Sequence, residues 1–422
     1  MNRASTVRRF TTAVFLFALT GSAALADTTV RVLRAEVPAD EKAYYDTIVK
    51  EFETTHPGVN VVFEYLANEA YKQKLTTLLQ SNQKPDIIFS WAGGVLRDQA
   101  AAGVLEDISA SFTGNWASSL SPASVQAFTV NGKVYGVPLG ASDVVFWTNK
   151  ELAQKAGINP EALKTWSDFL DAVKKAKAAG VTPIVVGGKD KWPLHFYYGY
   201  LMLREAGKAG LAAAIAGKDD GFAAGPFIKA GKDFKQLLAL EPFQPGFMDT
   251  TYEQATGQFG DGKALFHLMG DWDYGTSKQN SVTGKGVPDD KLTTVRFPAV
   301  PGGDGLPSDT FGGITGWSVI KGAPPEAVEF LKSLSSLENQ KKGGAAGIFI
   351  PVANGAETAI TNPFMRKMSE ALGASTYHQL FLDQELGADV GATINDVAAD
   401  LAQGATTPEE AAKTVQDAWS TH

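Results

Sequence analysis

Hydrophobic residues from residue 30 onward follow two alternating spacings, one typical of strands and one typical of helices. Short runs rich in β-branched and aromatic residues predict strands over 30–34, 59–65 and 85–89. Between these runs, apolar residues recur every three or four positions and predict a helix capped by Asp40 and a second helix over 69–82. This βαβαβ order predicts a parallel, doubly wound sheet.

A second set of elements begins near residue 140. Strand-like runs are predicted over 144–148, 181–186, 263–269 and 311–320. Helical spacing is predicted over 149–156, 166–179, 194–206, 227–240, 325–338 and 362–419. Glycine and proline crowd the segment 298–307, which predicts a loop that crosses between two bodies. A chain of 422 residues exceeds what one hydrophobic core usually serves, so two domains are expected.

Polar residues at the predicted strand ends locate a candidate ligand site. In an open parallel sheet, ligands bind beyond the carboxyl ends of the strands, which here carry Glu36, Asn68 and Trp91. Carboxylate, amide and indole groups without a glycine-rich phosphate loop suit a neutral, polyhydroxylated ligand. Glu36 and Asn68 could instead cap helices, and Trp91 could pack in the core. We favour ligand contact for Trp91 because the small residues 92–94 that follow leave one face of the indole open.

The first 26 residues carry the three parts of a secretory signal. Arg3, Arg8 and Arg9 precede an apolar run over 12–20, and small residues at 24–26 supply a cleavage site. The sequence contains no Cys, which leaves no disulfide, no thiolate metal site and no cysteine for a lipid anchor. We therefore expect a soluble, unanchored protein of the periplasm, with secretion into the medium as the alternative.

The net charge limits the kinds of partner that the protein is expected to bind. The formal charge is −8, and loss of the three arginines with residues 1–26 makes it −11. An acidic chain without a basic cluster does not suit nucleic acid or an anionic membrane surface. The five His residues are scattered and lack metal-ligand spacing, so neither a metal nor another cofactor is expected.

Asp271 and Asp273 flank Trp272 after a predicted strand and are the best enzymatic candidates in the sequence. Two carboxylates beside an indole could form part of a glycosidase site. Glycosidase carboxylates usually come from separate elements across the sugar, whereas these two share one turn. We therefore favour hydrogen bonding to a ligand over catalysis. The sequence has no nucleophile elbow and no zinc-binding His-Glu-x-x-His motif that would indicate another reaction.

Short motifs are spread over the chain in a particular order. They fall at 52–59, 84–91, 135–138, 147–150, 264–272, 312–313 and 404–410. Examples are Pro-Gly-Val at 57–59 and Tyr-Gly-Val-Pro at 135–138. Their order and spacing resemble the extracellular solute-binding proteins that supply sugars to ABC importers, the family of maltose-binding protein. One departure is Phe146-Trp147, where many relatives have Tyr in the crossing strand.

The resemblance implies two doubly wound α/β lobes joined by crossing strands, like the type II periplasmic binding proteins. We place lobe 1 at 27–140 with 302–348 and lobe 2 at 141–301 with 349–422. The resemblance also implies a monomer without catalytic activity. Such a protein binds a mono- or short oligosaccharide between its lobes and delivers it to the permease subunits of an ABC importer in the inner membrane. Closure is expected about crossings near 139–145, 298–311 and 347–352.

The predicted ligand-binding residues are Glu36, Asn68, Trp91, Asp143, Trp147, Trp192, Gly270, Asp271, Trp272 and Gly313. Trp91 and Trp272 are expected to stack on the sugar from opposite lobes, because the C–H faces of a sugar pack on aromatic rings. Two alternatives stay open. One is a secreted carbohydrate-active enzyme that uses Asp271 and Asp273. The other is a receptor for a non-sugar solute, such as phosphate or a polyamine. A polyamine site would need several carboxylates, for which the candidates are Glu36, Asp143, Asp271 and Asp273.

Overall fold

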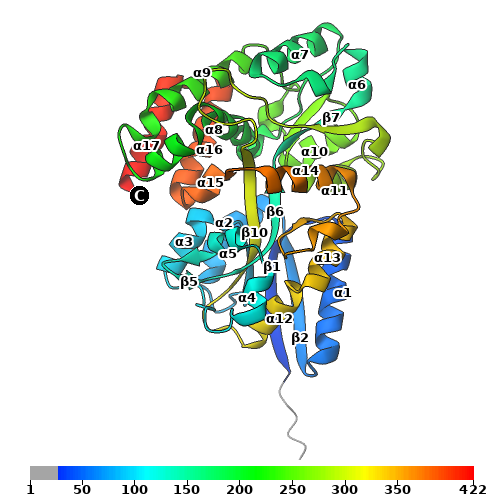
Figure 1. The fold of residues 1–422 in the computed structure, drawn as a ribbon, viewed down its shortest axis with the longest axis vertical. Coiled ribbons are helices and arrows are strands. Elements are labelled where there is room, and N and C mark those ends of the chain that lie inside the picture. Colours follow the sequence, from blue (N-terminus) through cyan, green and yellow to red (C-terminus); the bar gives the residue numbers. More distant parts are fainter. Residues whose placement is uncertain (1–26) are drawn as a thin grey trace, which may run out of the picture.

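Two lobes, one above the other, make up the protein (Figure 1). The computed structural model describes residues 27–422, and the predicted secretory signal lies outside them. Strands β6 (Val137–Asp143) and β10 (Thr310–Val319) run from one lobe toward the other. Within residues 27–422, no helix is long and apolar enough to cross a membrane.

The first lobe is built on a seven-stranded mixed sheet. Its strand order is β11-β6-β10-β3-β1-β2, and β12 pairs with β10 outside this path. Strand β1 pairs in parallel with both β2 and β3, which confirms the βαβαβ prediction for this region. The remaining strands of this sheet are β1 (Thr28–Ala35), β2 (Val59–Leu66), β3 (Ile87–Ser90), β11 (Ile350–Pro351) and β12 (His378–Leu380).

The helices described for the first lobe are α1 (Ala39–Thr55), α2 (Asn68–Leu79), α3 (Gly93–Ala101), α4 (Gly114–Ser119), α5 (Pro122–Ala127), α12 (Glu326–Leu334) and α13 (Leu337–Ala346), together with a hairpin of β4 (Thr129–Val130) and β5 (Lys133–Val134). Two of them, α1 and α2, follow the predicted apolar spacing, and the helix predicted over 325–338 is divided into α12 and α13, whereas α3, α4 and α5 were not predicted. The prediction that Asp40 caps the first helix is wrong. Helix α1 begins at Ala39, and Asp40 lies inside its first turn, where a carboxylate is favoured by the helix dipole.

The second lobe has a smaller sheet than predicted. Its strands β7 (Val145–Asn149), β8 (Phe266–Met269) and β9 (Leu292–Val295) pair antiparallel in the order β8-β7-β9. The predicted strand over 181–186 is reduced to isolated bridges at Ile184, so the parallel pairing in this lobe is only local. The α/β class holds, but helices dominate this half of the molecule.

Ten helices are described for this half. They are α6 (Lys150–Lys155), α7 (Trp166–Ala178), α8 (Trp192–Ile215), α9 (Gly225–Leu238), α10 (Tyr252–Gly260), α11 (Asp273–Asn280), α14 (Pro363–Ala374), α15 (Leu382–Glu385), α16 (Ala388–Gln403) and α17 (Pro408–Thr421). Short 3₁₀ turns are η1 (Pro160–Ala162), η2 (Gly188–Asp190), η3 (Gly221–Ala223), η4 (Phe247–Asp249), η5 (Asp289–Lys291) and η6 (Glu357–Ala359). Helix α8 is interrupted at Gly207, whose backbone is not helical (φ 61°), so a first helix ends at the predicted residue 206 and a second one continues after a kink.

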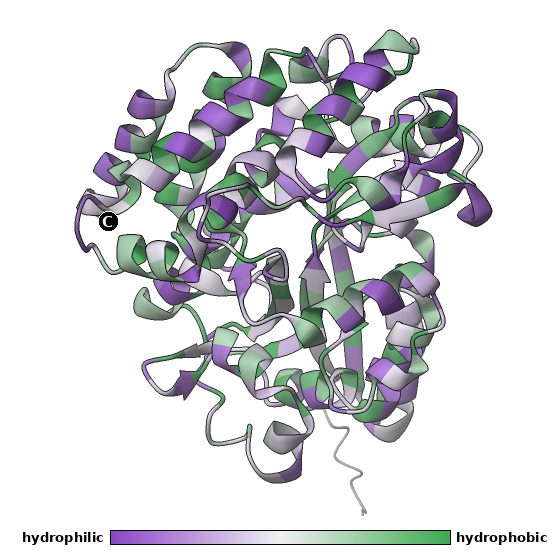
Figure 2. Ribbon diagram, turned by 45° about the horizontal axis from the view of Figure 1, so that its top comes forward, coloured by the Kyte–Doolittle hydropathy of each residue, from purple (hydrophilic) through white to green (hydrophobic). Residues whose placement is uncertain are grey.

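Each lobe has its own hydrophobic core. The strands inside each lobe carry many hydrophobic residues, and hydrophilic residues are frequent on the outer helices (Figure 2). Leu139 belongs to the first core and Val144 to the second. Within β10 the core changes between Phe311, in the second, and Ile314, in the first. Strand β10 thus passes from one core to the other, and the chain enters the second core directly after β6. The lobe boundaries given above stay a prediction.

A buried arginine fixes the loop that leads into β10. Arg204 on α8 has no exposed surface, and its guanidinium donates hydrogen bonds to four backbone carbonyls of the 297–309 segment at 2.9–3.2 Å. Carbonyls without a partner in the interior would each cost about 1–3 kcal/mol. Arg204 therefore helps to hold the proline- and glycine-rich crossing in place.

The two lobes touch where α3 meets α15. A Cβ atom at Gly94 would meet the backbone nitrogen of Gly387 and, at 2.5 Å, the carbonyl oxygen of Glu385. Arg97 on the same helix forms an ion pair with Glu385 at 3.2 Å. Glycine at 93–94 therefore allows a close backbone approach between lobes. This corrects the interpretation that these small residues serve to leave the Trp91 indole open.

Candidate functional site

A cavity of about 300 Å³ lies between the lobes. Its first-lobe wall comes from the carboxyl ends of β1, β2 and β3, where Glu36, Asn68 and Trp91 follow the strands. Its second-lobe wall includes Trp192, at the start of α8, and Trp272, at the start of α11. The volume is at the small end of the range for ligand sites, roughly 300–1,000 Å³.

Six of the ten predicted ligand residues line this cavity: Glu36, Asn68, Trp91, Trp192, Asp271 and Trp272. The other four do not line it: Asp143, Trp147, Gly270 and Gly313. The structure therefore brings the strand ends of the first lobe together with the Asp271-Trp272 turn of the second. The four residues that do not line the cavity are buried near the crossing strands.

Asn68 presents an unused acceptor to the cavity. It is the first residue of α2, and the residue before it, Ala67, makes no side-chain cap. The Oδ1 atom of Asn68 is buried and has no hydrogen-bond partner. The capping alternative for Asn68 is therefore not what the structure contains. Glu36 does not cap α1 either, because it is exposed and forms an ion pair with Lys42 at the cavity edge.

Trp91 lies between the lobes and packs against both hydrophobic cores. Its ring meets Phe89 and Tyr71 edge to face, with ring centroids 5.0 and 5.7 Å apart. The hydroxyl of Tyr71 donates to the carbonyl of Phe89, which joins α2 to the end of β3. These contacts fix the indole while it stays partly exposed to the cavity. Core packing and cavity lining thus coexist in one residue.

Two further indoles form the opposite wall. Trp272 is partly exposed, and a Cβ atom at Gly270 would overlap its ring. Gly270 therefore makes room for Trp272 and does not itself reach the cavity. Trp192 is 6% exposed, its ring lies 4.9 Å from that of Tyr252, and its Nε1 donor has no partner. The wall thus offers two indole rings and one free donor.

Asp271 is buried in the cavity wall with an unpaired oxygen. It is 3% exposed, and its Oδ1 has no hydrogen-bond partner. Burial raises the pKa of Asp271 to about 7, and the neighbouring Asp143 carboxylate adds to this rise, while hydrogen bonds from Ser142 and the backbone oppose it. A carboxyl group in this state readily accepts a hydrogen bond from a bound hydroxyl.

The Asp273 side chain is directed toward His267 and not toward the cavity. The side chain is fully buried, and Oδ2 lies 2.8 Å from Nδ1 of His267 on β8. It does not line the cavity, so the expectation that both aspartates meet a ligand is not reproduced by this geometry. The two carboxyl groups do not face a common substrate position, which removes the arrangement that a glycosidase needs.

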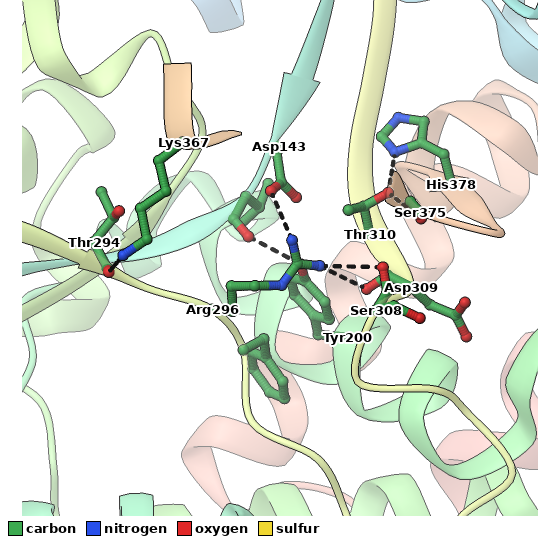
Figure 3. A network of polar contacts seen from close by, with 12 residues as sticks. Asp143, Tyr200, Thr294, Arg296, Ser308, Asp309, Thr310, Lys367, Ser375 and His378 are labelled. Carbon is green, nitrogen blue, oxygen red and sulfur yellow. Dashed lines mark hydrogen bonds and ion pairs between the residues drawn. The ribbon is translucent and has the colours of Figure 1, made fainter. Parts of the chain in front are cut away.

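Asp143 belongs to the crossing between lobes and not to the cavity (Figure 3). Its carboxylate lies 3.7 Å from Nη1 of Arg296, whose other terminal nitrogen donates to the carbonyls of Ser308 and Asp309 at 3.3 Å. Asp143 is 1% exposed, and burial raises its pKa to about 7, against the opposing effect of Arg296. Asp143 therefore helps to tie the end of β6 to the segment before β10.

Trp147 and Gly313 have structural roles. Trp147 lies in β7, all of whose residues are buried, and its Nε1 donates to the carbonyl of Gly270 at 3.0 Å. Gly313 pairs with Ser142 in the β6–β10 ladder. A Cβ atom there would lie 2.5 Å from the ring of Phe381, which does line the cavity. Trp317 in β10 is a core residue at 1% exposed.

Several cavity residues were missed by the sequence analysis. Lys72 extends toward both lobes, with Nζ 5.8 Å from the ring centroid of Trp91 and 5.4 Å from that of Trp192. It lies one helical turn after Asn68, which is a signal that could have identified it. Phe381 and Asp383 lie in the segment 362–419, for which the sequence predicted helix but no site. They reach the cavity because the chain returns to it from a segment that is far away in the sequence.

Metal ligation finds no support among residues 27–422, where no group of three or more His, Asp or Glu side chains could hold an ion. Among residues 27–422, the polar atoms without partners around the cavity are two acceptors, Asn68 Oδ1 and Asp271 Oδ1, and two donors, Arg34 Nε and Trp192 Nε1. Such a set forms hydrogen bonds with hydroxyl groups, each of which both donates and accepts.

Comparison with known proteins finds one family and many similar folds. The model of a family described as bacterial extracellular solute-binding proteins matches residues 36–341. A probable sugar-binding periplasmic protein of Mesorhizobium japonicum is 31% identical over 223 residues, which cover 52% of this chain and 51% of that protein. A multiple sugar-binding protein of Streptococcus mutans is 26% identical over 270 residues, covering 61% and 60%. The chain spans about half the length of the curated relatives it matches.

Solved structures match over nearly the whole molecule. One, from work on xylan utilization by the thermophilic bacterium Caldanaerobius polysaccharolyticus, is 28% identical with a TM-score of 0.85, covering 92% of this chain and 99% of that one. A chitin oligosaccharide binding protein is 22% identical with a TM-score of 0.83, covering 93% and 98%. These similarities confirm the predicted α/β fold of the periplasmic binding protein type.

The raised pKa of Asp271 predicts how the ligand-free protein responds to pH. The folded state keeps its proton up to pH about 7, whereas the unfolded chain loses it near pH 4. Between these values the folded state binds more protons, so the free energy of unfolding falls as pH rises. We expect Asp271→Asn to flatten this fall in urea unfolding at pH 5, 6 and 7.5. Asp171→Asn, at an exposed position of α7, serves as control. A parental slope in Asp271→Asn would contradict the assignment.

Proposed function

The chain belongs to the bacterial extracellular solute-binding protein family, and we propose that it binds a carbohydrate between its lobes and delivers it to an ABC importer. Relatives named as sugar-binding proteins support the ligand class. The similar structure from work on xylan utilization makes xylose-based oligosaccharides the first candidates, and the chitin oligosaccharide binding protein adds a second series.

The observation that carries this proposal is the pairing of aromatic rings and unused acceptors across one cavity. Trp91 and Trp272 come from opposite lobes, and a pyranose between them would pack its C–H faces on the indoles. Asn68 and Asp271 add buried oxygens without partners. Burying such groups without a hydrogen bond is costly, so a ligand rich in hydroxyl donors would be strongly preferred.

The proposal assigns no catalytic step to the protein. Asp273 is engaged with His267, and Asp271 remains as a single buried carboxyl group in the cavity wall. The enzyme alternative needs two carboxyl groups on either side of a scissile bond. The polyamine alternative loses support as well, because Asp143 is paired with Arg296 and Asp273 does not line the cavity. A sugar therefore fits the available groups better than either alternative.

Location and partners are part of the same proposal. The signal-like residues 1–26 and a sequence without Cys support a free periplasmic monomer that meets the permease subunits in the inner membrane. The lobes, at 27–140 with 302–348 and at 141–301 with 349–422, would rotate about crossings near 139–145, 298–311 and 347–352. Closure over the sugar would present a surface to the membrane partner.

Titration calorimetry with mono- and oligosaccharides tests the proposed function. We expect one sugar per monomer, with recovery of the intact sugar after prolonged incubation. A thermal-shift panel gives a first screen, because ligand at a hundredfold over its Kd adds about 2.7 kcal/mol to the stability of the folded state. Binding of an amine or an anion, with no sugar bound, would overturn the carbohydrate assignment. Accumulation of cleaved sugar with the parent but not with Asp271→Asn would establish the enzyme alternative.

Replacing Trp272 tests the second-lobe wall. We expect Trp272→Ala to weaken sugar binding by about 1–3 kcal/mol, since one apolar face of the ligand loses its cover. Trp419→Ala removes a partly buried indole of α17 outside the cavity and is the matched control. Isothermal titration with the best sugar of the panel measures both. Parental affinity in Trp272→Ala would mean that its ring serves packing alone.

The glycine contact between α3 and α15 tests closure. We expect Gly94→Ala to hinder the approach of the lobes, so that the ligand-saturated variant has a larger radius of gyration and a weaker affinity than the parent. Gly373→Ala on α14 meets nothing within 4 Å and is the control. Small-angle scattering with and without ligand measures the effect. If ligand left the radius of gyration of the parent unchanged, the closure model would fail.

A further inference from the structure

A second and larger cavity adjoins the first. It measures about 530 Å³ and extends between α2 and α3 of the first lobe and α15 and α16 of the second. Six residues line both cavities: Lys72, Phe89, Trp91, Trp192, Asp383 and Gln384. The two indoles therefore stand at the junction. A ligand longer than the first cavity would pass between them and continue into this space.

The second cavity carries unused acceptors from both lobes. Gln99 on α3 has a buried Oε1 without a partner, and Asn395 on α16 has a buried Oδ1 without one. The Nδ2 atom of Asn395 donates to Asp383 at 3.3 Å, which leaves its oxygen free toward a ligand. Buried amide oxygens are normally hydrogen-bonded, so this pair indicates that a molecule with donor groups completes the site.

The charge of the lining restricts that molecule. Carboxylates of Glu69, Asp98, Asp190 and Asp383 line the second cavity, whereas Lys72 is the only lysine or arginine that residues 27–422 contribute to it. Lys72 is already within 3.2 Å of Glu69. The net negative lining would repel a uronic acid or a sulfated sugar. Neutral hydroxyl groups, which donate to carboxylates and amide oxygens alike, fit this lining.

We propose that the second cavity is an extension site and that the ligand is a neutral oligosaccharide of at least two rings. One ring occupies the first cavity, the chain passes between Trp91 and Trp192, and further rings bind beside Gln99 and Asn395. This inference rests on the proposed function and goes beyond it by fixing the length and charge of the ligand.

Calorimetric titration with matched series separates the extension from the proposed function. The series run from monosaccharide to trisaccharide for xylose, glucose as malto-oligomers, and N-acetylglucosamine, with an oligogalacturonide as the charged member. We expect the best trisaccharide to bind at least about tenfold more tightly than its monosaccharide, and the galacturonide not to bind. Equal affinity for mono- and trisaccharide, or tight binding of the galacturonide, overturns the extension and leaves the proposed function standing. If none of these sugars binds, the proposed function itself fails.

Variants locate the additional rings. Ala392 is exposed on α16 and lines only the second cavity, so Ala392→Trp fills that space without touching the first. We expect this variant to reduce the advantage of the trisaccharide to less than about threefold. Gln99→Ala should weaken trisaccharide binding about three- to tenfold, as loss of one hydrogen bond predicts. Gln126→Ala, on an exposed face of α5, is the matched control.

Two readouts keep the test decisive. Monosaccharide affinity in Ala392→Trp and Gln99→Ala should stay within about twofold of the parent, which shows that the first cavity is intact. Circular dichroism and thermal unfolding confirm that both variants are folded. If folded Ala392→Trp kept the full trisaccharide advantage, the further rings would lie elsewhere and the extension site would be rejected.

Discussion

The pairing of β6 with β10 is the constraint on which the site depends. The two strands pair antiparallel from Val137–Trp317 to Asp143–Gly312. Strand β10 has residues in both hydrophobic cores, and the chain that leaves β6 enters the second core at Val144. The ladder sets how far apart the lobes stand and in which direction they face. Trp91 reaches the cavity from β3, the neighbour of β10, and the Asp271-Trp272 turn follows β8, the neighbour of β7. The positions of both cavity walls therefore depend on the pairing of β6 with β10.

The buried polar atoms of the cavity have a thermodynamic meaning. Asn68 Oδ1, Asp271 Oδ1 and Trp192 Nε1 are removed from water but lack a protein partner. Their desolvation costs free energy in the folded state, and the cost is offset when a ligand supplies the missing hydrogen bonds. The same atoms favour selectivity, because an analogue that lacks a matching hydroxyl leaves one of them unpaired. In the proposed site, aromatic area would supply affinity, and the unpaired atoms would discriminate among ligands.

The first lobe and its strand ends could be predicted because their signals are local. Strands 30–34 and 59–65 alternate with helices at clear spacing, and Glu36, Asn68 and Trp91 follow those strands directly. Trp147 was misplaced although a signal existed. It lies in the continuous apolar run 144–148, a pattern typical of a strand buried on both faces. No local pattern indicated the role of Asp143, because its partner Arg296 is far away in the sequence.

The contribution of the C-terminal segment could not be derived from sequence. Phe381 and Asp383 reach the cavity because β12 pairs with β10 and sets α15 beside the lobe junction. That pairing links residues 310–312 to 378–380 and has no counterpart in local spacing.

Contacts that do not involve ligand also join the lobes. Lys72 lies over Trp192 of the second lobe, and Arg97 is paired with Glu385. Cation–π and partly exposed ion-pair contacts are each worth about 1 kcal/mol or less. In the closure proposed above, they would reduce the free-energy gap between open and closed lobes without closing the protein by themselves. Sugar affinity should therefore depend on the lobe contacts as well as on the cavity walls, since a ligand that binds the closed state must also meet the cost of closure.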